Sequence, residues 1–215
     1  MKDNSVKKLT TIAMLSAFAY VSTLLIRIPV VLFLKYDPKD IVITLGGLIY
    51  GPVTALIVSV IVSFVEMVTI SDTGVIGMIM NILASCSFAC TVSLFYKKHR
   101  NISGAIKGLI CGCLCATSVM LLWNYLITPI YMNVDRATVV GLLLPYILPY
   151  NLLKTALNAV IVFLLYKPVV NSLRNLGFAQ QSSAKKDQSK AFYPIVGIVV
   201  LITVILLMMV LKGVI

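Results

Sequence analysis

Residues 40–68 read DIVITLGGLIYGPVTALIVSVIVSFVEMV, and this stretch decides the fold class. Beyond the break at Gly51 and Pro52, its second half carries a single charged residue, Glu66. At about 1.5 Å per helical residue, this half is long enough to cross the hydrocarbon core of a bilayer. Residues 40–50 cover about half that distance, so they predict a short or tilted helix that turns at the break into a spanning one.

Runs of similar length and hydropathy lie on both sides of this stretch. The chain has 60% hydrophobic and 12% charged residues, well outside the roughly 45–50% apolar and 25% charged residues of soluble domains. It is therefore predicted to be an all-α polytopic membrane protein built on a six-helix bundle. The further spans are expected at residues 9–28, 75–96, 105–130 and 139–166, the last of them bent because it holds Pro145 and Pro149.

A polar segment separates this bundle from one more apolar run. Residues 180–190 read QQSSAKKDQSK, a composition typical of a flexible linker. An additional transmembrane helix is expected beyond it. The chain is thus divided into a six-helix membrane domain (1–175), a cytoplasmic linker (176–191) and the additional helix (192–215).

The charge distribution predicts how the chain is oriented. The sequence holds 18 Lys and Arg residues against 7 Asp and Glu residues, a net charge of +11. Placing the N-terminus in the cytoplasm puts most of these cations in cytoplasmic loops, as at Lys97, Lys98 and Arg100, in agreement with the positive-inside rule. A multi-pass protein of the cell (plasma) membrane with a cytoplasmic N-terminus is expected, and a nucleic-acid partner is not.

The residue inventory argues against catalysis. The single histidine, His99, lies in a basic loop, so no Ser-His, Cys-His or zinc-binding pair can form within a span. No Walker loop is present, so any ATP-driven function must use the motor of another subunit. The five cysteines lie inside predicted spans, where Cys acts as a small hydrophobic residue. We expect no enzyme, no catalytic residues, no metal and no cofactor; a membrane enzyme or a structural subunit is the alternative from another class.

Small residues at helical spacing predict close helix packing. Most such stripes should hold the bundle together, but one on the outer surface would dock another membrane subunit. The stripes comprise Ala13 and Ala17, then Ala55, Ser59 and Ser63, and finally Gly104, Gly108 and Gly112.

Polar residues at membrane depth are costly and mark function. Asn151, Lys154 and Asn158 share one helix face, and with Asn81, Asn124 and Glu66 they should converge on the extracellular side, beside the first loop (29–39). Carboxamides, a lysine and nearby aromatic rings suit a planar, hydrogen-bonding small molecule. The alternative is that these groups pair with one another or with backbone to fix helix register. That is harder to argue for Lys154, because a buried charge must be compensated.

Several motifs match a known family over about residues 7–174. They are Ala13-x-x-x-Ala17, Asp40 followed by the short helix and Tyr50-Gly51-Pro52, Gly77-Met78-Ile79-Met80-Asn81, Pro149-Tyr150-Asn151-Leu152-Leu153-Lys154, and Asn124-Tyr125 with Pro129 and Tyr131. On these residues the chain resembles a substrate-binding S component of an energy-coupling-factor (ECF) vitamin transporter, most of all the riboflavin type.

The resemblance implies an outward pocket for riboflavin, which is transported cargo and not a cofactor. Asn124, Asn151 and Lys154 would hydrogen-bond the flavin ring, and Asn81 would line the pocket. The first loop would gate the pocket, through Leu34, Tyr36 and Asp40.

The resemblance also implies partners. Ala13 and Ala17 would dock on a membrane-embedded T component that couples to two ATP-binding subunits, and ATP hydrolysis would reorient the S component to release the vitamin inside. Two features depart from the family pattern: the additional helix (192–215), and Glu66 in place of an uncharged or amide residue. Glu66 leaves a different vitamin or planar precursor as the alternative ligand.

Overall fold

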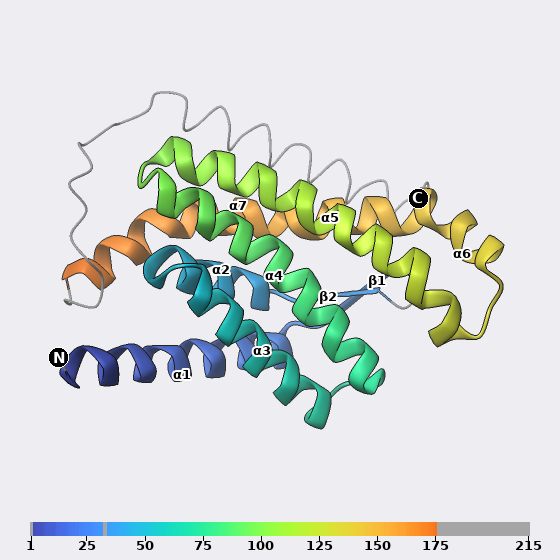
Figure 1. The fold of residues 1–215 in the computed structure, drawn as a ribbon, viewed down its shortest axis with the longest axis horizontal. Helices are drawn as coiled ribbons and strands as arrows, with labels where there is room; N and C mark the ends of the chain where they lie inside the picture. Colours follow the sequence, from blue (N-terminus) through green and yellow to red (C-terminus); the bar gives the residue numbers. More distant parts are fainter. Residues whose placement is uncertain (1, 32–33, 176–215) are drawn as a thin grey trace.

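The computed structural model describes residues 2–31 and 34–175, which form a bundle of helices with one small strand pair (Figure 1). The elements in chain order are α1 (Lys2–Leu25), β1 (Ile28–Val31), β2 (Leu34–Tyr36), α2 (Lys39–Tyr50), α3 (Pro52–Thr69), α4 (Gly74–Lys98), α5 (Ile102–Met132), α6 (Arg136–Leu142), the π-helix η1 (Leu143–Ile147) and α7 (Leu148–Asn175).

Five helical segments of this part of the chain are long and apolar enough to cross a membrane. They are α1, α3, α4, α5 and the continuous run from α6 through η1 into α7. Together with the short α2 they confirm the expected six-helix bundle. The expected linker (176–191) and additional helix (192–215) lie outside the described residues.

The short helix α2 lies inside the bundle, in contact with α1, α3, α4 and α7. Every residue from Lys39 to Leu48 is buried, as a helix that is apolar around its whole circumference requires. A Cβ on Gly47 would lie 2.9 Å from the Cβ of Ala55 on α3 and closer still to the hydroxyl of Ser93 on α4. Glycine therefore lets α2 approach both neighbours, and the break after it is made by Gly51, whose φ of 96° lies in the left-handed region.

The first loop is more ordered than the sequence analysis expected. β1 pairs with β2 in antiparallel register, with Ile28 opposite Tyr36. Two tyrosines fix this ribbon to α7: the hydroxyl of Tyr150 donates to the carbonyl of Lys35 at 2.6 Å, and the hydroxyl of Tyr36 donates to Oδ1 of Asn158 at 3.1 Å. The ribbon is thus part of the wall of the bundle.

The predicted bend in the last span is confirmed and lies at η1. Pro145 lies within this π-helical segment, where the amide of Leu148 donates to the carbonyl of Leu143, five residues back. Proline removes one backbone donor, and a π-bulge is a common way for a helix to absorb that loss. Pro149 lies in the first turn of α7, directly after the π-helical segment, and removes a second backbone donor at the bend.

The three stripes of small residues divide between two roles. Those on α3 and α5 face the interior; a Cβ on Gly108, for example, would lie 2.9 Å from the carbonyl oxygen of Val92 on α4. Ala13 and Ala17 on α1 are exposed on the outside of the bundle. Two stripes therefore hold this bundle together, and the third is open to the surroundings.

Gly108→Ala tests the packing of α5 on α4. The added methyl meets a backbone carbonyl that cannot rotate away, so we expect a loss of about 1–3 kcal/mol of stability, as is typical of overpacking. Thermal unfolding in detergent measures it. Gly141→Ala on α6 is the matched control, because nothing lies within 4 Å of its Cβ and alanine favours the helix by up to about 1 kcal/mol. Equal melting temperatures for the two variants would contradict the close approach.

Candidate functional site

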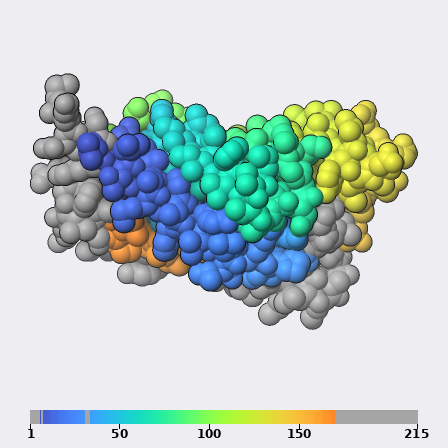
Figure 2. All heavy atoms as spheres, turned by 90° about the horizontal axis from the view of Figure 1, so that it is seen from below, coloured from blue at the N-terminus to red at the C-terminus, as the bar shows by residue number. Residues whose placement is uncertain are grey.

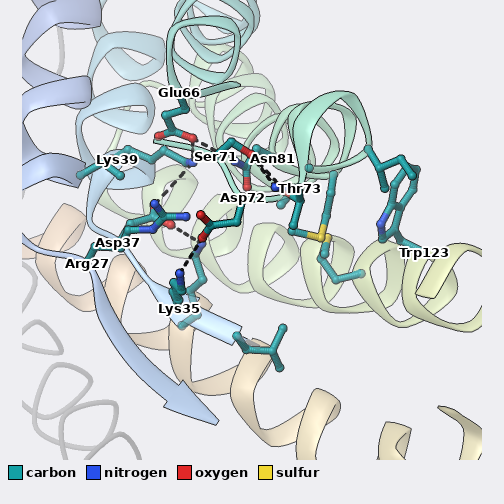
Figure 3. A pocket seen from close by; sticks show the side chains of 18 of the residues that line it. Arg27, Lys35, Asp37, Lys39, Glu66, Ser71, Asp72, Thr73, Asn81 and Trp123 are labelled. Carbon is teal, nitrogen blue, oxygen red and sulfur yellow. Dashed lines mark hydrogen bonds and ion pairs between the residues drawn. The ribbon is translucent and has the colours of Figure 1, made fainter. Parts of the chain in front are cut away.

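A cavity of about 240 Å³ opens between the β ribbon, the connection from α3 to α4, and the helices α5 and α7. Its lining changes character from one end to the other (Figure 3). Glu66, Lys39 and Asn81 lie together at one end, and Trp123 lies at the opposite end. The cavity therefore suits an amphipathic ligand.

The structure divides the predicted ligand-binding residues into two groups. Leu34, Asn81, Asn151 and Lys154 line the cavity. Asn124, Tyr36 and Asp40 do not line it and lie behind its wall, where their polar groups bond to other side chains or to backbone.

Asn124 is fully buried, and both ends of its carboxamide bond within α5. Its Nδ2 donates to the carbonyl of Met120 at 2.7 Å, and its Oδ1 accepts from the hydroxyl of Thr128 at 2.9 Å. Asn151 differs, because its Nδ2 donates to the carbonyl of Ile147 at 2.8 Å while the residue still lines the cavity. In this conformation Asn151 faces the cavity and Asn124 does not.

Lys154 has carboxylate partners within the protein. Its Nζ lies 3.2 Å from Oδ2 of Asp37 and 3.7 Å from Oδ2 of Asp40. Asp40 also accepts hydrogen bonds from the hydroxyl of Ser85 at 2.5 Å and from Nδ2 of Asn158 at 3.4 Å. The charge of Lys154 is thus compensated without a ligand, and Asp40 positions the lysine from behind the wall.

A second buried ion pair continues from the first. Nζ of Lys39 lies 2.5 Å from Oε2 of Glu66 and 3.9 Å from Oδ1 of Asp37. Nδ2 of Asn81 donates to the same Glu66 oxygen at 2.9 Å. We call the sequence Lys154, Asp37, Lys39, Glu66 the ion chain; Asp37 joins its two halves.

Asp37 and Lys39 belong to the site, although the sequence pattern did not predict them as members. Residues 35–40 read KYDPKD, a dense run of charged residues at the start of a helix that is otherwise apolar. This pattern could have indicated both residues. Burying a charge costs several kcal/mol unless it is paired. Charged residues buried at the start of α2 are therefore expected to form ion pairs with one another or with Lys154.

Two side chains directly before α2, Tyr36 and Asp37, have shifted pKa values. Burial raises the pKa of the Asp37 carboxyl, but the ammonium groups of Lys154 and Lys39 lower it by more, so the net pKa lies below its usual value. Burial raises the pKa of Tyr36 to about 12, since the cation at Lys154 offsets only part of the desolvation. Asp37 is therefore ionised and Tyr36 is a neutral hydrogen-bond donor at neutral pH.

The mouth of the cavity is held by contacts that are more exposed. Nζ of Lys35 on β2 lies 3.1 Å from Oδ2 of Asp72, which lies between α3 and α4, and the Asp72 side chain is 77% exposed. Nη1 of Arg27 donates to the carbonyl of Ile70 at 2.8 Å. Solvent weakens contacts between exposed groups, so these contacts close the rim weakly compared with the buried ion chain.

The chain matches known proteins over most of its length. A family model described as "ECF transporter, substrate-specific component" matches residues 7–166. The riboflavin transporter RibU of Staphylococcus aureus (strain TCH60) is 30% identical over 79% of this chain and 94% of its own length. The riboflavin transporter FmnP of Bacillus subtilis (strain 168) is 29% identical over 79% of this chain and 97% of its own.

A solved structure supports the same relationship. This structure, of the S component of a bacterial ECF transporter, is 30% identical in sequence and superposes with a TM-score of 0.67, covering 79% of this chain and 99% of the solved one. The resemblance to riboflavin-type S components is confirmed. Because such proteins are transporter subunits whose small molecule is cargo, the expectations of no enzyme and no cofactor are confirmed as well. The chain belongs to the family of substrate-specific components of ECF transporters.

Proposed function

We propose that this membrane protein captures riboflavin for ECF-type import. The observation that carries the proposal is the cavity itself, which offers Asn151 and Lys154 on α7, Asn81 on α4 and the indole of Trp123 on α5. Amide and ammonium donors suit the carbonyls and nitrogens of a flavin ring, and an indole provides a flat apolar surface for it. The similarity to riboflavin transporters over 79% of the chain supports the same ligand.

The proposed orientation places the cavity at the outer face of the membrane. The basic residues at the other end of the bundle, among them Lys97, Lys98 and Arg100, would then lie in the cytoplasm together with the N-terminus. Leu34 on the β ribbon lines the cavity, and the ribbon would act as its gate. Asn124 would reach the ligand only after a change of conformation, because both ends of its carboxamide are bonded within α5.

A T component and two ATP-binding subunits complete the proposed importer. Ala13 and Ala17 are exposed on α1, which lies at the surface of the molecule (Figure 2, dark blue). Small residues one turn apart allow another membrane helix to approach closely. We assign binding and docking to residues 1–175. The linker (176–191) and the additional helix (192–215) stay a sequence-based proposal.

One observation favours a second candidate ligand. Glu66 places a carboxylate at the cavity wall, which would suit a planar precursor or another vitamin with more hydrogen-bond donors than a flavin ring carries. A binding screen of vitamins and flavin precursors distinguishes this candidate from riboflavin.

The first test is the visible spectrum of the purified protein. A captured flavin would give a yellow preparation, and added riboflavin would lose fluorescence as it binds. A colourless protein that does not quench riboflavin fluorescence would rule out the proposed ligand.

Lys154→Ala should weaken riboflavin binding by about tenfold or more, because a hydrogen bond to a charged group contributes about 1.5–3 kcal/mol. Fluorescence quenching at several protein concentrations measures the affinity. Lys98→Ala is the matched control: Lys98 is exposed in the last turn of α4, away from the cavity. An unchanged affinity in Lys154→Ala would assign this lysine to the ion chain alone.

Replacing both Ala13 and Ala17 with Trp should abolish uptake of riboflavin by cells that contain the complete transporter, while the purified variant still binds riboflavin. The large side chains would keep the T component from α1 without touching the cavity. Leu114→Trp, at a position on α5 that is 60% exposed, controls for bulk on the outer surface. Normal uptake by the double variant would show that docking does not use this stripe.

A further inference from the structure

Glu66 has an oxygen with no partner in the described part of the protein. The residue is 3% exposed, lies one turn before the end of α3 and lines the cavity. Its Oε2 accepts both the ammonium of Lys39 and the amide of Asn81, while Oε1 is buried with no hydrogen bond. A buried acceptor left unpaired destabilises the protein, and more so when it is charged.

The charge balance leaves one carboxylate in excess of the lysines. The ion chain together with Asp40 holds three carboxylates, at Asp37, Asp40 and Glu66, against two ammonium groups, at Lys39 and Lys154. The group therefore carries one net negative charge. Lys39 takes up only Oε2 of Glu66, so the pairing of charges gives no role to Oε1.

The surroundings of Glu66 indicate which kind of donor would suit this unpaired oxygen. The hydroxyls of Ser71 and Thr73 and the amide of Asn81 gather at the same end of the cavity (Figure 3). This end offers hydroxyl, amide and carboxylate groups, which suit a chain of hydroxyl groups, whereas Trp123 at the far end suits a flat ring. The terminal torsion of a glutamate is broad, so a small rotation presents Oε1 to the cavity.

We infer that Glu66 is a specificity-determining residue that accepts a hydrogen bond from a hydroxyl on the flexible side chain of the ligand. The inference rests on the proposed function and adds an orientation to it. The hydroxyl-bearing chain lies toward α3 and the connection from α3 to α4, and the ring lies toward α5. A ligand with the same ring but without hydroxyls gains nothing from Glu66.

The test compares two flavins that share the ring system: riboflavin, and lumiflavin, in which a methyl group replaces the hydroxyl-bearing chain. Both affinities are measured by fluorescence quenching on the purified wild-type protein and on Glu66→Gln. The glutamine keeps the size of the side chain and an acceptor for Lys39. We expect riboflavin binding to weaken about ten- to a hundredfold, the effect of losing a hydrogen bond to a charged acceptor, and lumiflavin binding to change little.

Asp135→Asn is the matched control for the change from carboxylate to amide. Asp135 is exposed, caps α6 and lies outside the cavity, and asparagine caps a helix as well as aspartate does. Neither affinity should change in this variant. If Glu66→Gln does not fold, Glu66→Asp replaces it, because aspartate keeps the charge beside Lys39 but withdraws the oxygens by one methylene, and the same selective loss is expected.

The outcomes separate the two proposals. A wild-type protein that binds no riboflavin overturns the proposed function, and this inference with it. Riboflavin binding by the wild type that Glu66→Gln leaves unchanged, or that falls equally for riboflavin and lumiflavin, overturns the inference and leaves the proposed function standing.

Discussion

The structure depends on the pairing of charges inside an apolar bundle. The side chains of Lys39 and Lys154 are only 2% and 13% exposed, and each must meet a carboxylate or carry a desolvation cost of several kcal/mol. Asp37 meets both, at 3.9 and 3.2 Å. This one residue, on the connection between β2 and α2, therefore ties the ribbon to α7 and to the pair formed by α2 and α3.

That constraint gives the cavity a firm base and a loose rim. At the base, the ion chain is buried and braced by Ser85 and Asn158 through Asp40. At the rim, Lys35 and Asp72 meet in the open, where solvent weakens their attraction. A ligand can displace the rim contacts at little cost, but the groups that would recognise it stay in place. A cavity that recognises a small molecule tightly needs this preorganisation.

The sequence predicted the helices of the bundle but not the ion pairs around Lys154. Hydropathy located the spans, and the short apolar run after Asp40 predicted α2, because both follow from local composition. Amide chemistry and the family resemblance both predicted Asn124 beside Asn151 as a ligand contact. In this structure its carboxamide bonds within α5, and its contact with a ligand stays a prediction. The partners of Lys154 depend on how the connection before α2 folds back onto α7, a long-range arrangement that no periodicity in the chain encodes.

The helix α2 also connects the cavity with α1, which carries the proposed docking surface. Its first turn carries Lys39 and Asp40 at the base of the cavity, and farther along Ile43 packs in the same cluster as Ile12 of α1. The outer side of α1 carries Ala13 and Ala17, exposed on the surface. Since α1 contributes no side chain to the ion chain, its outer face can bind a partner without disturbing the charges at the cavity. Thr23 of α1 also lines the cavity, so a shift of α1 would reach the cavity both directly and through the packed interior of α2, which is rigid because close-packed side chains have little room to yield.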